Sequence, residues 1–173
     1  MKNKILIILL AFFLSFCFFV LFKSLQSSSI YVPEKKEDRQ FAEFVSEDLF
    51  TEKKITSSEI FKGSDYYILN IWASWCAPCR KEHPQLMELS KNSSIKLIGL
   101  NYRDDSKKAK KFLNKLGNPF SVNITDQNGT ISIELGGYGI PETFLINKDK
   151  KIIKTFIGNL NNESVRQINL IVK

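Results

Sequence analysis

Apolar and polar positions along this chain predict an α/β domain behind one long apolar segment. Residues 5–22 carry no charge, and only Ser15 and Cys17 interrupt the apolar types there. From about residue 41, short apolar runs separated by polar turns are typical of buried strands. We expect strands at 44–45, 54–56, 66–72, 95–100, 121–125, 142–146 and 151–157. We expect helical segments at 57–63, from Cys76 onward, at 109–116, at 131–135 and from 161 or 162 to 172.

Two of these helices are predicted from apolar spacing, and the last of them carries Val165, Ile168 and Val172. Ala109, Phe112, Leu113 and Leu116 recur at i, i+3, i+4 and i+7, which forms one apolar helical face. Strands and helices interleave in the first part of the domain, and a hairpin followed by a helix closes it. The predicted fold class is therefore α/β, with a central mixed sheet flanked by helices on both faces.

The apolar segment is long enough to cross a bilayer as a helix. Lys2 and Lys4 precede it, which by the positive-inside rule keeps the N-terminus in the cytoplasm. No small-x-small cleavage site follows the segment, so we expect residues 1–23 to be an uncleaved membrane anchor. The alternative is a lipoprotein signal acylated at Cys17. It is disfavoured because Phe16 is too bulky for such a site.

The next residues have the composition of a tether. Residues 24–40 combine serines, one proline and a run of mixed charges, a composition that cannot bury a core. We therefore expect a linker at 24–40 and one domain at 41–173. The net charge is +7, and without the three lysines at positions 2, 4 and 23 it is +4. Since no aromatic-interleaved basic stripe is present, a nucleic-acid partner is not expected.

The chemistry of the chain is concentrated in Cys76-Ala77-Pro78-Cys79, between a buried strand and a helix. Unpaired N–H groups at a helix N-terminus favour a thiolate on the first sulfur. A zinc site would need four ligands, and only Cys17 and His83 could add to the pair. Haem attachment through C-x-x-C-H is excluded because Arg80 follows the motif. The pattern predicts a redox-active dithiol that needs neither a metal nor another cofactor.

Several segments around this motif carry a family resemblance. They are Asn70 with 72–84 (including Pro84), 101–105, 116–120 and 139–146. In this order they resemble the thioredoxin superfamily, and more narrowly the DsbE/CcmG proteins. Those are membrane-anchored thiol:disulfide oxidoreductases of cytochrome c biogenesis. Gly137 departs from the family pattern, which more often has valine there.

The resemblance implies a thioredoxin-like fold over 41–173 and a specific reaction. The expected substrate is the disulfide of apocytochrome c, in its C-x-x-C-H motif, reduced before haem attachment. Cys76 is expected to attack as the thiolate, and Cys79 to resolve the mixed disulfide. Other cytochrome c maturation proteins are expected partners, with a DsbD/CcdA-like membrane thiol reductant as electron donor. The expected location is the bacterial inner membrane, with the catalytic domain in the periplasm.

Three residues are expected to meet the substrate. By resemblance, Pro141 follows a cis peptide bond that faces the dithiol. Its neighbour Ile140 would offer backbone groups to an extended substrate strand. Trp75 either shields the sulfurs or fills the surface beside them.

Three further residues are expected to tune the dithiol. Asn70 stands where thioredoxins bury an acid, and a neutral amide cannot act as a base. Glu82 and Glu142 are the candidates to replace that acid, since both closely follow active-site segments. A carboxylate near the dithiol would raise the pKa of the thiols by like-charge repulsion. For Glu82 the alternative is a solvated residue in the second turn of the helix.

Two other functions remain open from the sequence. One is a general periplasmic disulfide reductase or isomerase with a broad range of substrates. The other is a holdase that presents apocytochrome or haem without turnover. Trapping the partner of Cys76 would discriminate among these possibilities.

Overall fold

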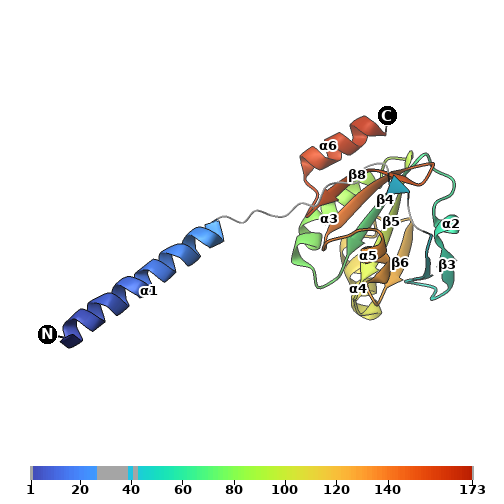
Figure 1. The fold of residues 1–173 in the computed structure, drawn as a ribbon. Helices are drawn as coiled ribbons and strands as arrows, with labels where there is room; N and C mark the ends of the chain where they lie inside the picture. Colours follow the sequence, from blue (N-terminus) through green and yellow to red (C-terminus); the bar gives the residue numbers. More distant parts are fainter. Residues whose placement is uncertain (1, 27–38, 41–42, 173) are drawn as a thin grey trace. The chain divides into compact units, whose positions relative to one another are not determined.

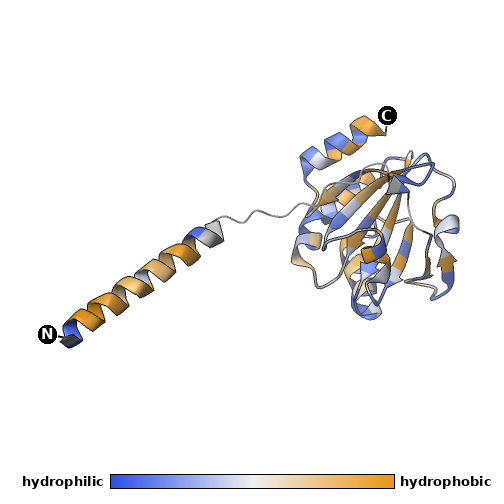
Figure 2. Ribbon diagram, in the orientation of Figure 1, coloured by the Kyte–Doolittle hydropathy of each residue, from blue (hydrophilic) through white to orange (hydrophobic). Residues whose placement is uncertain are grey.

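The computed structural model describes residues 2–26, 39–40 and 43–172, which fall into two units, 1–35 and 36–173. In the first unit, α1 (Lys2–Gln26) is one continuous helix with exposed apolar side chains along its length. Of the described residues, only those of Asn3–Lys23 form a helix long and apolar enough to cross a membrane. At 1.5 Å per residue such a helix spans about 30 Å, the thickness of the hydrocarbon core. α1 is therefore a candidate membrane anchor, and Figure 2 shows its apolar character.

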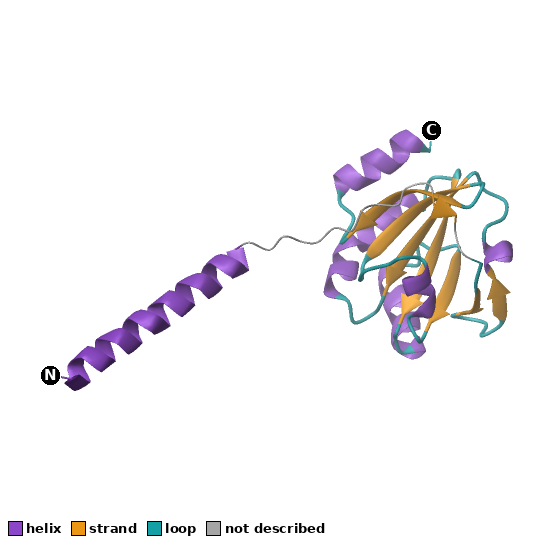
Figure 3. Cartoon of the chain, in the orientation of Figure 1, coloured by secondary structure: helices purple, strands orange, loops and turns teal. Residues whose placement is uncertain are grey.

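Among the residues that the structure describes, the second unit is built on one eight-stranded mixed sheet with the order β1-β8-β7-β4-β5-β6-β2-β3. Figures 1 and 3 show this sheet with its flanking helices. Its strands are β1 (Arg39–Gln40), β2 (Val45–Asp48), β3 (Lys54–Thr56), β4 (Tyr66–Trp72), β5 (Ile95–Tyr102), β6 (Val122–Asp126), β7 (Glu142–Asn147) and β8 (Lys151–Ile157). β4, β5 and β6 run parallel to one another, and the other pairings are antiparallel. Since β4 and β5 are parallel neighbours, their carboxyl ends lie at the same edge of the sheet.

The described residues of this unit form five helices: α2 (Ser57–Ile60), α3 (Ala77–Leu89), α4 (Ser106–Leu116), α5 (Thr130–Glu134) and α6 (Asn162–Ile171). Side-chain caps fix where several of them begin. The Asp105 carboxylate accepts the Lys108 N–H at the start of α4, and Asn161 accepts the Ser164 N–H at the start of α6. Such a cap stabilises a helix by about 1 kcal/mol, because it pairs an otherwise orphaned N–H.

Each face of the sheet carries its own apolar core. Along β4, Ile68 and Trp72 pack in one cluster with side chains of α3, α4 and α6. Leu69 and Ile71 point to the opposite face and pack with side chains of α2 and α5. Both faces of the central strand are covered, so β4 is a continuous buried run. This arrangement confirms the predicted α/β class with helices on both faces.

The sheet differs from the sequence prediction at its margins. Arg39 and Gln40, assigned to the linker, pair with β8 as a short edge strand. Two residues are too few to leave an apolar pattern, so the sequence gives no signal for them. β2 extends to Asp48, beyond the predicted strand at 44–45, because Glu47 and Asp48 pair with β6. Most of the predicted linker lies outside the described residues.

Candidate active site

The two cysteines of the C-x-x-C motif form a disulfide at the N-terminus of α3, just after β4. Cys76 caps the helix, and its sulfur accepts the backbone N–H of Cys79 at 3.1 Å. Pro78 occupies the first turn, where its missing N–H leaves no bond unmade. Cys76 and Cys79 are 4 % and 2 % exposed, so both residues are buried in the disulfide form. The positive end of the helix dipole lies at these sulfurs.

The loop that carries the motif is fixed by Asp104, which sequence reasoning did not single out. Its carboxylate accepts the Ser74 backbone N–H at 2.6 Å and the Ser74 hydroxyl at 2.8 Å. The same carboxylate accepts the side-chain amide of Asn101 at 3.0 Å. Asp104 follows β5 and Ser74 follows β4, two parallel neighbours whose carboxyl ends meet. The parallel pairing of these two strands is the signal that could have indicated the contact between Asp104 and Ser74.

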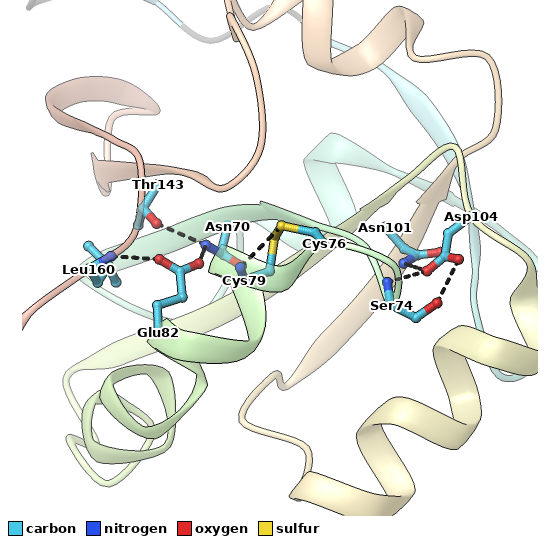
Figure 4. Close-up of a disulfide and its surroundings, with 9 residues drawn as sticks. All are labelled: Asn70, Ser74, Cys76, Cys79, Glu82, Asn101, Asp104, Thr143 and Leu160. Atoms are coloured by element: carbon cyan, nitrogen blue, oxygen red, sulfur yellow. Dashed lines mark hydrogen bonds between the residues drawn. A yellow bond between two sulfur atoms is a disulfide. The ribbon is translucent and has the colours of Figure 1, made fainter.

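A buried polar network lies on the other side of the cysteines (Figure 4). The Asn70 amide nitrogen donates to the Glu82 carboxylate at 2.8 Å and to the Thr143 hydroxyl at 2.9 Å. The other Glu82 oxygen accepts the Leu160 backbone N–H at 2.7 Å. The structure thus brings together two of the predicted tuning residues, Asn70 and Glu82. Thr143 and Leu160 were not predicted, because their partners are far away in the sequence.

Glu82 is fully buried, which excludes the alternative of a solvated residue on the helix. Burial raises its pKa to about 7, since a carboxylate loses its hydration inside the protein. The hydrogen bonds from Leu160 and Asn70 act in the opposite direction, but they are the smaller effect. A carboxyl group near pKa 7 can release and accept a proton at neutral pH.

Glu142, the third predicted tuning residue, is also fully buried and begins β7. Its carboxylate accepts the Tyr138 backbone N–H at 2.8 Å and so holds the glycine-rich loop before β7. A Cβ atom on Gly137 in this loop would lie 2.9 Å from the Ser132 carbonyl oxygen and 3.0 Å from Ile71. This close approach leaves no room for a side chain at Gly137, the position at which the chain departs from the expected family pattern.

The peptide bond between Ile140 and Pro141 is cis, as expected. In the register of β7 against β4, Glu142 lies opposite Ile71, so Pro141 lies at the edge that carries the motif. Two aromatic side chains on these loops are exposed: Trp75 is 59 % accessible and Tyr138 is 64 % accessible. The Trp75 indole N–H donates to the Arg103 carbonyl at 3.2 Å, which fixes one edge of the ring. The sequence analysis did not single out Tyr138, because this residue lies outside the motif segments.

His83 was the remaining candidate metal ligand near the motif, and its contacts are those of a packed structural residue. Its Nε2 lies 3.0 Å from the Gly117 carbonyl oxygen, and its ring packs edge-on against Phe112. Burial lowers its pKa. Within the described residues, no group of three or more His, Cys, Asp or Glu side chains is placed to hold a metal ion.

Comparisons with known proteins agree with this geometry. The Redoxin family profile matches residues 36–169. The thiol:disulfide interchange protein DsbE of Vibrio cholerae is 39 % identical over 168 residues, which cover 95 % of this chain and 90 % of the relative. The chain belongs to the Redoxin family, among its DsbE-type thiol:disulfide interchange proteins. The DsbE protein of Escherichia coli is 34 % identical over 165 residues, covering 93 % of this chain and 89 % of that protein.

A solved structure shows the same fold in a DsbE-type protein of Chlorobium tepidum. It superposes with a TM-score of 0.67 at 22 % identity and covers 79 % of this chain and 96 % of that one. The thioredoxin-like fold expected from the motif segments is thereby confirmed. Membership in the DsbE type makes the chain a thiol:disulfide oxidoreductase. The C-x-x-C pair of its site is the chemical group such an activity requires.

Proposed function

We propose that this DsbE-type protein is a membrane-anchored reductant that reduces the apocytochrome c disulfide before haem attachment. The observation that carries the proposal is the Cys76–Cys79 pair at the start of α3, at the sheet edge that also carries the cis Ile140–Pro141 bond. The substrate follows from the resemblance to proteins of cytochrome c biogenesis. The cysteine pair works without a cofactor, and residues 1–23 anchor the chain in the inner membrane with its domain in the periplasm.

The reaction transfers two electrons from the dithiol to the substrate disulfide. The Cys76 thiolate attacks one substrate sulfur, which forms a mixed disulfide and releases the other substrate sulfur as a thiolate. Cys79 then loses its proton and attacks Cys76, which releases the second substrate thiol and leaves the Cys76–Cys79 disulfide. A DsbD/CcdA-like membrane thiol reductant returns two electrons to this disulfide, since the periplasm itself is oxidising.

The substrate strand lies along the edge formed by Ile140 and Pro141. Ile140 offers backbone groups for strand addition, and the exposed Trp75 covers the substrate side chains next to the sulfurs. Support for this arrangement comes from the register that places this loop beside the carboxyl end of β4.

Asn70, Glu82 and Glu142 tune the pair. Glu82 acts as the proton carrier in place of the buried acid of thioredoxins, because burial brings its pKa to about 7. Glu142 acts by holding Tyr138 and the loop that precedes the cis bond. Replacing Glu142 with Gln should slow apocytochrome reduction. Unchanged kinetics in that variant would remove Glu142 from the mechanism.

The substrate is tested by comparing reduction rates of two oxidised substrates with the purified full chain in detergent. One substrate is a peptide with a C-x-x-C-H disulfide, and the other is insulin. We expect much faster reduction of the peptide, and loss of both reactions in Cys76→Ser. Comparable rates on both substrates would instead identify a general reductase. A Cys76→Ser variant that still supports cytochrome maturation would identify a holdase.

A further inference from the structure

The side chain of Asn70 lies between Glu82 and the cysteine pair (Figure 4). Asn70 lies in the central strand β4 and is completely buried. Its amide nitrogen carries two hydrogens, and both are used, one on Glu82 at 2.8 Å and one on Thr143 at 2.9 Å. With Glu82 ionised, a reversed amide would place its oxygen against the carboxylate. The position of the Asn70 side-chain oxygen is therefore fixed by its neighbours.

That oxygen, Oδ1, is buried and has no hydrogen-bond partner among the residues that the structure describes. Asn70 and Cys79 line the same small void behind the disulfide, together with the side chains of Trp72 and His83. The void is too small to admit a water molecule, so solvent cannot satisfy the oxygen. A buried acceptor without a donor costs free energy, and such a site calls for an explanation.

We propose that Asn70 Oδ1 is the hydrogen-bond acceptor of the Cys79 thiol when the cysteine pair is reduced. In the disulfide, the Cys79 sulfur carries no hydrogen and cannot donate. Reduction adds two electrons and two protons to the pair, breaks the S–S bond and gives Cys79 an S–H group. That group donates to Oδ1, which fills the vacant acceptor. The Trp72 indole N–H also lines the void, but it is a donor and cannot accept from a thiol.

Two consequences follow for the reaction, and both rest on the proposed roles of Cys76 and Cys79. The hydrogen bond exists only in the reduced state, so it favours the dithiol over the disulfide. It also favours the neutral form of Cys79, which leaves Cys76 as the only thiolate until a mixed disulfide has formed. We expect the equilibrium constant for reduction by glutathione to fall about tenfold in Asn70→Leu. A tenfold change corresponds to about 30 mV, towards a more negative potential.

The direct test observes the thiol itself. In the full chain with Cys17→Ser and Cys76→Ala, Cys79 is the sole thiol, and its S–H stretch is recorded by infrared spectroscopy. We expect a frequency lowered by hydrogen bonding with Asn70 present, and a return to the free-thiol value in Asn70→Leu. Thr143→Val is the matched control, because it changes the network but leaves Oδ1 in place. It should keep the lowered frequency.

A second measurement needs no substitution at position 70. In the unaltered chain, the ¹³C resonance of the Asn70 side-chain carbonyl should shift when the cysteine pair is reduced. A free-thiol S–H frequency with Asn70 present, or an Asn70 carbonyl unaffected by reduction, would overturn the proposal. Both measurements are made without a substrate. Their failure is therefore distinct from a failure of the apocytochrome assignment, which the peptide and insulin assays detect.

Discussion

The titration of Glu82 gives a quantitative prediction about stability. Its carboxyl group is fully buried, and burial raises the pKa from an ordinary value of 4.5 to about 7. The two hydrogen bonds, from Leu160 and Asn70, offset only part of that effect. Replacing Glu82 with Gln keeps the shape of the side chain but removes the titration. The perturbation therefore separates the charge of Glu82 from its packing.

The sign follows from linkage between protonation and folding. The folded state binds this proton more tightly than the unfolded state, so the contribution to stability is complete below pH 4.5. It is lost as the pH rises towards about 7. At 1.36 kcal/mol per pKa unit, the difference between 4.5 and about 7 corresponds to about 3 kcal/mol. The Glu82→Gln variant has no carboxyl group at this position, so its free energy of unfolding lacks this pH-dependent loss.

Urea unfolding of the oxidised full chain in detergent, followed by tryptophan fluorescence between pH 4 and pH 8, measures the effect. In the oxidised form, neither Cys76 nor Cys79 titrates. The difference in unfolding free energy between the parent and Glu82→Gln should change by about 3 kcal/mol across this range. Glu88→Gln, an exposed residue on the same helix, is the control and should show no such change. A pH-independent difference for Glu82→Gln would refute the assigned burial effect.

Three further substitutions have expected outcomes. Gly99→Ala places a Cβ within 2.8 Å of the Phe120 ring and the Trp72 indole nitrogen, so the free energy of unfolding in urea should fall by about 1–3 kcal/mol. A variant as stable as the parent would contradict this close packing. Asp104→Asn removes an acceptor of Ser74, so the free energy of unfolding should fall by about 1–3 kcal/mol and peptide reduction should be slower. An unchanged reduction rate would show that the position of this loop does not affect the reaction. Trp75→Ala should raise KM for the C-x-x-C-H peptide. It should change the free energy of unfolding by less than about 0.5 kcal/mol, because the side chain is largely exposed. An unchanged KM would show that Trp75 is not part of the substrate edge.

Local patterns were enough to predict most of the fold. The apolar runs at 66–72 and 95–100 are covered on both faces, and such strands are conspicuous in a sequence. The helix after Cys76 was predicted from the polar–apolar pattern that follows the motif, and the structure has it as α3. The position of the C-x-x-C motif between a buried strand and this helix also indicated that the cysteine pair is a redox-active dithiol. These features depend on neighbours in the sequence, so a sequence alone reveals them.

Long-range contacts account for what the sequence did not reveal. Asp104 and Ser74 are 30 residues apart and meet only because β4 and β5 are parallel. Buried Glu82 accepts a hydrogen bond from Leu160, 78 residues away, and the sequence alone could not choose between a buried and a solvated carboxylate. The edge strand at Arg39 and Gln40 was missed for a similar reason, since its partner is β8.

Trapping the reaction intermediate is the most direct test of the proposed mechanism and substrate. In Cys79→Ser, expressed as the full chain in cells that make c-type cytochromes, attack by Cys76 should stop at the mixed disulfide. Mass spectrometry should then find Cys76 joined to a cysteine of the C-x-x-C-H motif of apocytochrome c. The adduct should be absent in Cys76→Ser/Cys79→Ser. Adducts spread over unrelated proteins, or none through Cys76, would contradict a dedicated apocytochrome reductant.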